Sequence, residues 1–468
     1  MTNGEKTAKQ PRGMRAFIIV WVGQFISLMG TAMTNFAIPI YIFTETQRVQ
    51  ELALLGMAFM IPLIAMSPFA GVIVDRSNRK VMMMISDLAA GAMTILVLIL
   101  FSTGRLEIWH LYITGAVSGA FQAFQWPAYS AAISVMLPKK HYGRANGLLS
   151  LAESGSTIAA PLLAGAMLGF IGLRGILLID IATFSIAIFT LFLVHIPQPP
   201  RTAEGAAGEG NLLREAWYGF QYIFDRRSLL GLQLIFMAGN FISSIAFITL
   251  PALILFRTNN NEIALGTIQS VAGIGGVVGA LVMSTWGGPK RLIHGVLLGW
   301  FLSSLLGMVL FGLAQTLVIW AIAGFFFLFF VPIINGSNQA IWQAKVAPDV
   351  QGRVFSARRL IAWITNPLAS LIAIPLADNI FGPALDVNGV LTDTFLATLV
   401  GTGPGAGLSL MFVITGLLTA VVGLSGYLFP AIRNVEEILP DHVATDGDEE
   451  STVVEEPAPE EVLAVEGV

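Results

Sequence analysis

The sequence of 468 residues contains no cysteine and few charged residues, since Asp, Glu, Lys and Arg make up only 12% of it. The lack of cysteine excludes disulfide bridges and thiolate metal sites. The charged fraction is about half that of an average soluble domain, and 55% of the residues are hydrophobic. A single globular core stops growing at about 250–300 residues and cannot bury so much apolar material. Most of it must therefore face lipid.

Several sequence patterns of enzymes are also missing. No glycine-rich loop ends in Gly-Lys-Ser or Gly-Lys-Thr, so ATP is not the evident energy source. Neither His-Glu-x-x-His nor Gly-x-Ser-x-Gly is present, and the five histidines lie near the ends of apolar runs or in the acidic tail. We therefore expect no enzymatic activity, no cofactor, no metal site and no nucleic-acid partner.

The apolar residues form twelve runs, each long enough for a helix to cross the lipid bilayer. A bilayer core of about 30 Å needs about 20 apolar residues in a helix. The first run is too long for the apolar region of a cleavable signal, so we expect it to stay as a span. The predicted spans cover residues 16–41, 51–73, 81–102, 108–136, 146–170, 175–195, 229–256, 264–286, 292–313, 316–343, 355–377 and 405–429.

A long polar gap divides these spans into two sets of six. The gap begins at Pro197, continues through a segment rich in Gly, Ala and Glu, and ends in an amphipathic stretch at 217–224, which is suited to lying on the membrane surface. The tail is acidic and poor in aromatic residues, which predicts disorder. The sequence thus predicts an N-terminal arm (1–15), a first six-helix bundle (16–196), a cytoplasmic central loop (197–228), a second six-helix bundle (229–430) and a disordered acidic tail (431–468).

The basic residues predict the orientation in the membrane. An even number of spans places both termini on the same side. Of the 25 Lys and Arg residues, the only ones on the other side are Arg48, Arg105, Arg174 and Arg257. Because cytoplasmic loops carry the excess of Lys and Arg, we expect a multi-pass protein of the cell membrane with both termini in the cytoplasm.

The two halves carry related polar sets. In each set the residues are spaced i, i+3, i+4 and i+7, so they share one helix face, and a constant offset of 213 residues separates the sets: Gln122, Gln125, Trp126 and Tyr129 in the fourth span, and Asn335, Asn338, Gln339 and Trp342 in the tenth. Duplicated halves that meet around a midplane site are typical of secondary transporters. The first and seventh spans add Gln24, Thr31, Asn35, Gln233 and Asn240 as further cavity candidates.

The loop after the second span contains a specific motif. It reads Gly71-Val-Ile-Val-Asp75-Arg76-Ser-Asn-Arg79-Lys80, which resembles the signature between the second and third helices of the major facilitator superfamily. The second half has a degraded counterpart at 286–291, Trp-Gly-Gly-Pro-Lys-Arg, which keeps the basic pair and lacks the Asp. The resemblance extends over the whole chain apart from its tails.

Within this superfamily the chain is similar to bacterial macrolide, multidrug and siderophore exporters of the drug:proton antiporter type, on residues 126–128, 144–147 and 351–356. The resemblance implies an all-α fold of two pseudo-symmetric six-helix bundles that work by alternating access. It also implies that the motif residues Gly71, Asp75, Arg76, Arg79 and Lys80 act as a conformational switch, with Asp75 at the start of the eleventh helix. The arginine that many such exporters carry in the fourth helix is absent here.

Two acids in the spans are candidate proton carriers. A charge at the bilayer centre costs at least about 2.5–3.5 kcal/mol, and burial favours the protonated carboxyl group. Glu153 in the fifth span is the first candidate, and Asp180 in the sixth, with Arg174 as a possible partner, is the second. Asp87 lies two turns from Lys80, so we expect it to pair with the basic loop.

The sequence therefore predicts a monomeric secondary transporter that exports small amphipathic compounds of the macrolide or multidrug type, with the proton as coupling ion and the lipid bilayer as its surroundings. Two alternatives use the same scaffold, a siderophore exporter and a lipid flippase. A third belongs to another class, a non-transporting membrane receptor or interaction protein that uses the acidic tail for docking.

Overall fold

A computed structural model of the chain describes residues 13–199, 202–207, 210–386 and 389–442, and within them it contains helices and no strand. The first half comprises α1 (Gly13–Thr46), α2 (Val49–Arg76), α3 (Arg79–Ser102), α4 (Ile108–Met136), η1 (Lys139–His141) and α5 (Tyr142–Leu193). A linker with α6 (Ala203–Ala207) and α7 (Leu212–Asp225) follows. The second half comprises α8 (Arg227–Ile248), α9 (Leu250–Arg257), α10 (Glu262–Trp286), α11 (Leu292–Ser303), η2 (Ser304–Val309), α12 (Leu310–Leu313), α13 (Leu317–Lys345), η3 (Pro348–Val350), α14 (Gln351–Trp363), α15 (Thr365–Pro375), η4 (Leu376–Phe381), α16 (Gly382–Leu385), α17 (Phe395–Val400) and α18 (Ala406–Ser425), and the short helices α19 (Pro430–Arg433) and α20 (Val435–Ile438) come last.

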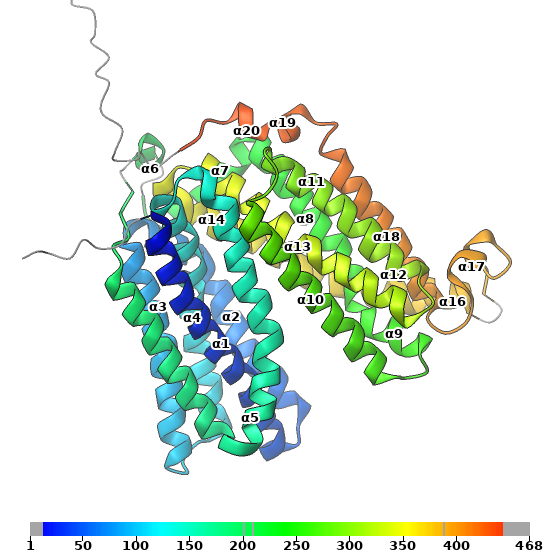
Figure 1. Cartoon of the computed structure of the whole chain (residues 1–468), viewed down its shortest axis with the longest axis horizontal. Coiled ribbons are helices and arrows are strands. Elements are labelled where there is room, and N and C mark those ends of the chain that lie inside the picture. Colours follow the sequence, from blue (N-terminus) through cyan, green and yellow to red (C-terminus); the bar gives the residue numbers. More distant parts are fainter. Residues whose placement is uncertain (1–12, 200–201, 208–209, 387–388, 443–468) are drawn as a thin grey trace, which may run out of the picture.

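These elements form the twelve predicted spans. Among the described residues, ten helical segments are long and apolar enough to cross a membrane. One of them, 139–193, contains two spans, because Gly172 has φ +61° and ψ −175° and the chain reverses there (Figure 1). The helix α4, with 29 residues, is the remaining span. The all-α fold with two six-helix bundles is thus confirmed.

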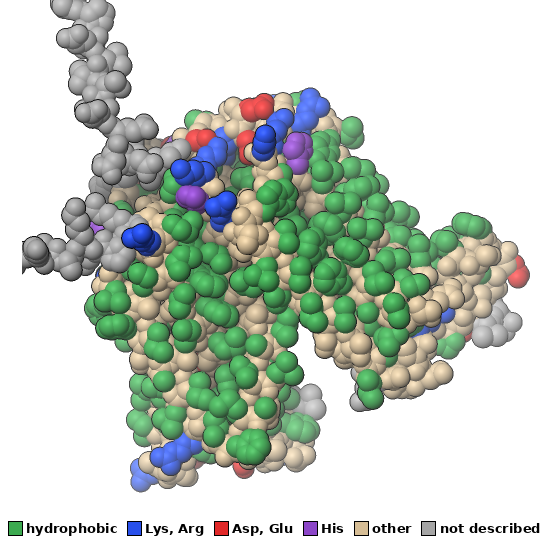
Figure 2. Space-filling view, viewed as in Figure 1, with side chains coloured by type: hydrophobic (Ala, Val, Ile, Leu, Met, Phe, Trp, Pro, Cys, Tyr) green, Lys and Arg blue, Asp and Glu red, His purple; other side chains and the backbone are tan. Residues whose placement is uncertain are grey.

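The two halves form a V (Figure 1). They meet at the end where α1 begins and α20 lies, here called the terminal end, and they diverge toward the opposite end. The space-filling view shows an open cleft between them at that opposite end (Figure 2). On the face shown in Figure 2, hydrophobic side chains are spread over the flanks of both halves, whereas many Lys and Arg side chains gather at the terminal end. This surface suits a protein whose flanks contact lipid.

Local sequence signals set where the helices begin and end. Asn78, Asn261 and Thr316 are N-caps whose side chains accept a hydrogen bond from a backbone amide of the first turn of α3, α10 and α13. Gly287 ends α10 in the left-handed conformation, with φ +87°, which glycine adopts without strain. These caps fix the polar turns at the membrane boundaries.

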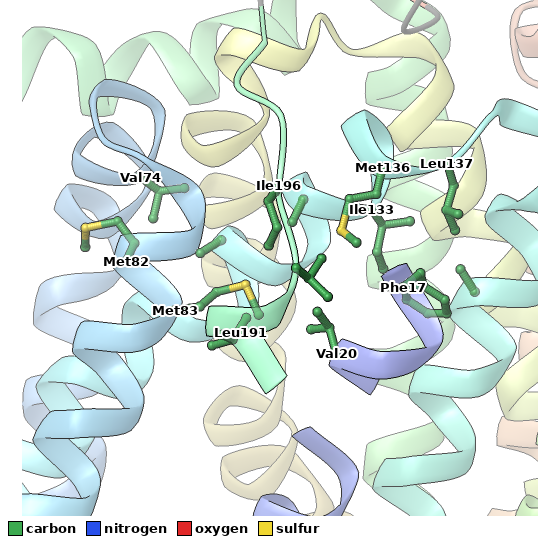
Figure 3. Packing of buried hydrophobic residues seen from close by; sticks show 14 of the residues in the cluster. Phe17, Val20, Val74, Met82, Met83, Ile133, Met136, Leu137, Leu191 and Ile196 are labelled. Carbon is green, nitrogen blue, oxygen red and sulfur yellow. The ribbon is translucent and has the colours of Figure 1, made fainter. Parts of the chain in front are cut away.

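The larger cluster of buried apolar side chains in the first half lies at the terminal end. There α1, α3, α4 and the segment after α5 contribute side chains such as Phe17, Met83, Ile133 and Ile196, all of which are buried (Figure 3). The same cluster includes Ala340 and Ala344 of α13 in the second half. The apolar contacts therefore continue from one half into the other at this end.

One face of α7, which contains the amphipathic stretch, packs against α2 and α14 and buries Glu215, Ala216, Gly219, Tyr222 and Ile223. Its other face leaves Trp217 and Phe224 exposed, so the stretch can still meet the membrane surface. One prediction about the segments that flank the bundles is wrong. The tail is not disordered from residue 431, because α19 and α20 pack against the second half and the structure describes the chain up to residue 442. Residues 1–12 of the predicted arm and 443–468 of the predicted tail lie outside the described residues.

Candidate functional site

The motif after the second span joins the two halves at the terminal end. A Cβ atom on Gly71 would lie 2.3 Å from the carbonyl oxygen of Gly352, so α2 and α14 touch through their backbones. One turn further, the Asp75 carboxylate accepts hydrogen bonds from the backbone amides of Gly352 (2.7 Å) and Arg353 (2.9 Å) and from Arg353 Nε (3.2 Å). A helix N-terminus stabilises a negative charge. Asp75 therefore lies at the start of the eleventh span, where the resemblance implies it should.

Two basic residues of the motif, Arg79 and Lys80, bind carbonyl oxygens. Arg79 is 1% exposed and donates hydrogen bonds to the carbonyl oxygens of Ala131 in α4 (2.6 Å) and of Pro348 in the second half. Lys80 stays within the first half, where its Nζ donates to the carbonyl oxygen of Val194 (2.8 Å). Arg79 thus holds the halves together, and Lys80 holds the motif to the end of α5.

The linker helix α7 adds an acid to this junction. Glu215 forms ion pairs with Arg76 of the first half and, at 3.5 Å, with Arg353 of the second half, and the amide of Gly210 donates to its carboxylate (2.9 Å). Burial alone would raise the pKa of Glu215, but the hydrogen bonds from Arg76 and Gly210 and the charge of Arg353 lower it below its usual value. Glu215 is therefore ionised and connects both halves to the linker.

Beside the motif, amide side chains form a polar seam between α4 or α5 and α13 or α14. Gln339 donates to Ser130 Oγ (2.5 Å), and Gln343 donates to the carbonyl oxygen of Ser130 (3.0 Å). Ser134 donates to Gln351 (2.6 Å), and Asn146 donates to Gln343 (2.8 Å). All of these polar side chains are buried. The terminal end is thus closed by hydrogen bonds between the halves, which can exchange for water.

A cavity of about 240 Å³ lies next to the seam, between the halves. Residues from α4, α5, α8, α13 and α14 line it. They are Trp126, Ser130, Asn146, Leu149, Ser150, Glu153, Gln233, Phe236, Asn335, Gly336, Asn338, Gln339, Arg358, Arg359 and Ala362. A wall that mixes aromatic rings with a few amides and charges suits an amphipathic ligand.

Two arginines of α14 reach this cavity, and sequence reasoning missed them. Arg358 donates a hydrogen bond to Gln339 Oε1 (2.9 Å) and its guanidinium lies 4.2 Å from the ring centre of Trp342. Arg359 lies over Trp363 at 4.3 Å and over Trp126 at 5.2 Å. The distribution of basic residues by side places both among the cytoplasmic charges, although they fall inside the predicted span 355–377. An arginine pair inside an apolar span is the signal that could have found them.

The predicted cavity residues separate into three groups. Trp126, Gln233, Asn335, Asn338 and Gln339 line the cavity. Others lie elsewhere: Gln24, Gln125 and Thr31 bind acids inside the first half, Asn240 donates to the carbonyl oxygen of Phe236 in its own helix, and Trp342 is fully buried beneath Arg358. The last group, Asn35, Gln122 and Tyr129, has no side-chain hydrogen bond among the described residues, and Asn35 and Gln122 are exposed.

The acids of the first half have unequal surroundings. Glu153 is exposed in the cavity and faces the charge of Arg359. Asp180 is 3% exposed and accepts hydrogen bonds from Thr31 (3.0 Å) and Thr94 (2.9 Å), so hydroxyl groups and not Arg174 satisfy it. Of these two acids, Glu153 is the one that lines the cavity.

Asp87 does not pair with the basic loop, contrary to prediction. Its carboxylate accepts hydrogen bonds from Gln24 (2.8 Å) and Gln125 (3.0 Å), and Gln125 also donates to Gln24 (2.9 Å). The acid therefore joins α1, α3 and α4 within the first half. The two amides predicted for the cavity wall are instead its partners.

Comparisons with known proteins agree with this architecture. A family model described as Major Facilitator Superfamily matches residues 20–370. Macrolide efflux protein A of Streptococcus pyogenes is 25% identical over 371 residues, which cover 78% of this chain and 90% of that protein. Multidrug resistance protein MdtG of Proteus mirabilis is 27% identical over 372 residues (75% and 87%), and multidrug efflux pump Tap of Mycolicibacterium fortuitum is 26% identical over 370 residues (75% and 86%).

Solved structures with the same fold include the human organic anion transporter MFSD10, with a TM-score of 0.63 and 14% identity over 88% of this chain and 100% of that one. A bacterial homologue of the iron transporter ferroportin in its outward-facing state gives the same TM-score and identity, over 88% and 99%. At this identity the likeness concerns the fold alone. The family model spans most of the sequence, and this chain belongs to the Major Facilitator Superfamily.

Proposed function

We propose that the protein is a secondary active exporter of small amphipathic compounds, of the macrolide or multidrug type, that works by alternating access and is driven by the proton gradient. The observation that carries the proposal is the cavity between two halves that are closed at one end and separated at the other. The relatives named as macrolide and multidrug efflux proteins support the direction and the class of cargo.

The contacts at the closed end support alternating access. They are hydrogen bonds and ion pairs, from Asp75, Arg79 and Glu215 and along the polar seam. Water can replace these contacts as the end opens, at a net cost of about 0.5–1.5 kcal/mol for each neutral hydrogen bond and about 1.5–3 kcal/mol for each one to a charged group. The opposite end can therefore close as this end opens, with the cavity reaching one side at a time.

The excess of Lys and Arg at the terminal end supports a cytoplasmic location for that end. With this orientation, the conformation described here is closed toward the cytoplasm and open to the outside. An exporter in this state has a path for release of its cargo. The proton would then enter from outside and reach Glu153 through the same cleft, since Glu153 is exposed in the cavity.

Efflux from living cells tests the proposal. The full chain is produced in a bacterial host that lacks its own multidrug pumps, and the retention of a macrolide antibiotic, of a cationic dye and of anionic fluorescein is measured with and without a protonophore. We expect faster loss of at least one compound than in the host with an empty vector, and we expect the protonophore to abolish the difference. Equal retention in both hosts, at confirmed membrane insertion, contradicts export, and efflux that survives the protonophore contradicts proton coupling.

A further inference from the structure

The charge inside the cavity is not balanced. Arg358, Arg359 and Glu153 are the charged residues of its lining, which leaves one positive charge in excess when all three are ionised. In the part of the chain that the structure describes, neither arginine forms an ion pair within 4.0 Å. An unpaired charge away from bulk water is costly and marks a ligand or ion pathway in membrane proteins.

Arg358 has donor capacity to spare. It is 7% exposed, and its Nε is buried and has no hydrogen-bond partner. Of its guanidinium atoms, Nη1 donates to Gln339, while the ring of Trp342 covers one face. A guanidinium presents five donors in a fixed fork that matches the two oxygens of a carboxylate or sulfonate. An oxyanion beside Arg358 would use donors that now lack a partner.

Two tryptophan rings hold Arg359 in position. The ring centre of Trp126 lies 5.2 Å from the guanidinium carbon of Arg359, and the ring centre of Trp363 lies 4.3 Å from it. Cation–π attraction therefore restrains this side chain. Trp126 and Phe236 also line the cavity, and they offer apolar surface beside the charges. The cavity thus combines a positive centre with aromatic walls.

We propose that this cavity binds the negative group of an amphipathic substrate, with Arg358 and Arg359 holding a carboxylate or sulfonate and Trp126 and Phe236 holding an aromatic or apolar body. The inference rests on the proposed function, since it names the chemical class of the exported compound. The shared chemistry is an oxyanion on an apolar body, and either a free amphipath or an anionic lipid can supply it.

Binding of two dyes with a common xanthene skeleton tests the charge requirement. The purified full chain is placed in nanodiscs of phosphatidylcholine, and fluorescence anisotropy measures the binding of anionic fluorescein and of cationic tetramethylrhodamine methyl ester. We expect fluorescein to bind more tightly than the cationic dye. Arg358→Gln and Arg359→Gln should each weaken fluorescein about tenfold or more, because each removes a hydrogen bond to a charged group. The cationic dye should bind no more weakly to either variant.

Two control variants separate charge from folding. Arg358→Lys keeps the charge and should keep part of the fluorescein affinity, and Arg433→Gln removes an exposed arginine of α19 and should leave the affinity unchanged. Tighter binding of the cationic dye by the wild type, or equal fluorescein affinity in the wild type and both Gln variants, overturns the inference. Efflux of a cationic compound in the cell assay would still support the proposed export in that case. Failure of the anion site and failure of the export proposal can therefore be told apart.

Nanodiscs that contain phosphatidylglycerol identify the source of the anion. If this lipid weakens fluorescein binding to the wild type and not the residual binding to Arg358→Gln, the lipid occupies the site and supplies the oxyanion. If fluorescein binds equally in both kinds of nanodisc, and Arg358 is still required, the site takes a free amphipath. Both results support an anion site.

Discussion

Gly143 lies directly against Gly287, and a Cβ atom on Gly143 would come 1.8 Å from the carbonyl oxygen of Gly287. This contact joins α5 of the first half to α10 of the second, and it is the counterpart of the contact between Gly71 in α2 and Gly352 in α14. Both contacts lie at the terminal end, where the halves meet. The closed end therefore depends on two backbone approaches that leave no room for a side chain.

Substitution of Gly71 by valine should open the terminal end. The valine side chain would collide with the backbone of Gly352, and backbone atoms cannot move aside as a flexible side chain can. Because the sequence has no cysteine, single cysteines added at Ser134 and Gln351 can be labelled without background. We expect faster labelling of both in Gly71→Val.

Gly56→Val is the matched control for this substitution, because Gly56 lies in the same helix and a Cβ atom there would have nothing within 4 Å. Labelling in Gly56→Val should equal that of the parent protein. If Gly71→Val also labels at the parental rate while it inserts normally, the contact does not close this end.

Asp75→Asn should insert into the membrane and lose transport. The substitution removes the negative charge from the N-terminus of α14 and weakens three hydrogen bonds, of which the one from Arg353 Nε is ionic. A hydrogen bond to a charged group contributes about 1.5–3 kcal/mol, so the ratio of closed to open molecules should fall by about tenfold or more.

The efflux rate at a measured membrane abundance checks this prediction. Asp393→Asn, which removes an exposed acid at the opposite end, serves as the control and should keep the parental rate. Parental efflux by Asp75→Asn would show that its ionised form is not needed for the transport cycle.

The ionised form of Glu215 should stabilise the protein at neutral pH. Its pKa is lower in the folded protein than the ordinary value of 4.5, so its contribution is fully present above that value and is lost as the pH falls through the folded pKa. The difference in melting temperature between the wild type and Glu215→Gln should therefore be constant from pH 7 to about pH 5 and shrink below the ordinary pKa.

Thermal unfolding of both proteins in detergent, followed across this pH range, tests the sign. Glu437→Gln is the control, since the Glu437 side chain is 65% exposed in its ion pair with Arg291. This substitution should change the melting temperature little at any pH. A stability difference that grows as the pH falls would contradict the lowered pKa of Glu215.

The end of the described chain should contribute to stability. Asp441 forms ion pairs with Lys139 of the first half and with Lys345 of the second, whose side chain is 1% exposed. Lys345 also donates hydrogen bonds to the carbonyl oxygens of Glu436 and Leu439. A chain that ends at residue 434 leaves this buried charge without these partners, which costs about 3 kcal/mol.

A chain that ends at residue 442 keeps all of these contacts and should match the full chain in melting temperature and efflux. The two truncations together test whether residues 435–442 act as part of the fold. Equal melting temperatures for the two would refute the prediction. Loss of efflux after removal of residues 443–468 alone would favour a docking role for the acidic tail.

Glu153→Gln should abolish efflux that is driven by a pH gradient. Glu153 is the acid in contact with the cavity, and Gln preserves its size while removing the titrating group. Transport into inside-out vesicles, started by an imposed pH gradient, measures the effect. Asp180→Asn is the comparison, because Asp180 is held by threonines away from the cavity. Undiminished transport by Glu153→Gln would exclude Glu153 as the proton carrier.

The fold could be predicted from the sequence because it has a strong local signal, whereas the contact of Asp75 with the start of the eleventh span was implied by the family resemblance. The length of apolar runs gives the spans, and α4 begins and ends where the run 108–136 does. The partners of buried acids could not be predicted in the same way. Asp87 meets amides from two other helices, and Asp180 meets hydroxyls from two others. Periodicity gives the face of one helix and not the neighbour that this face meets.

The cavity lining could likewise be predicted only in part from the faces of single helices. Gln339 and Trp126 were predicted from a helix face, but Ser130 completes the seam and has no distinctive pattern. Arg358 and Arg359 were assigned to a loop because a count of charges by side gives no depth in the membrane. In the structure α14 begins at Gln351, so both arginines lie within this helix and reach the cavity.

The two related contacts at the closed end are chemically unequal. The contact at Gly352 is reinforced by Asp75 and Glu215 and lies beside the linker helix, whereas the loop 286–291 beside Gly143 contains no acid. The linker, which connects the halves covalently, therefore lies at the same place as the ionic contacts between them. A protease cut in the linker before residue 210 would leave the halves held by non-covalent contacts alone, and neutralising both acids would remove the ionic contacts beside the linker while the polar seam and the apolar contacts remain.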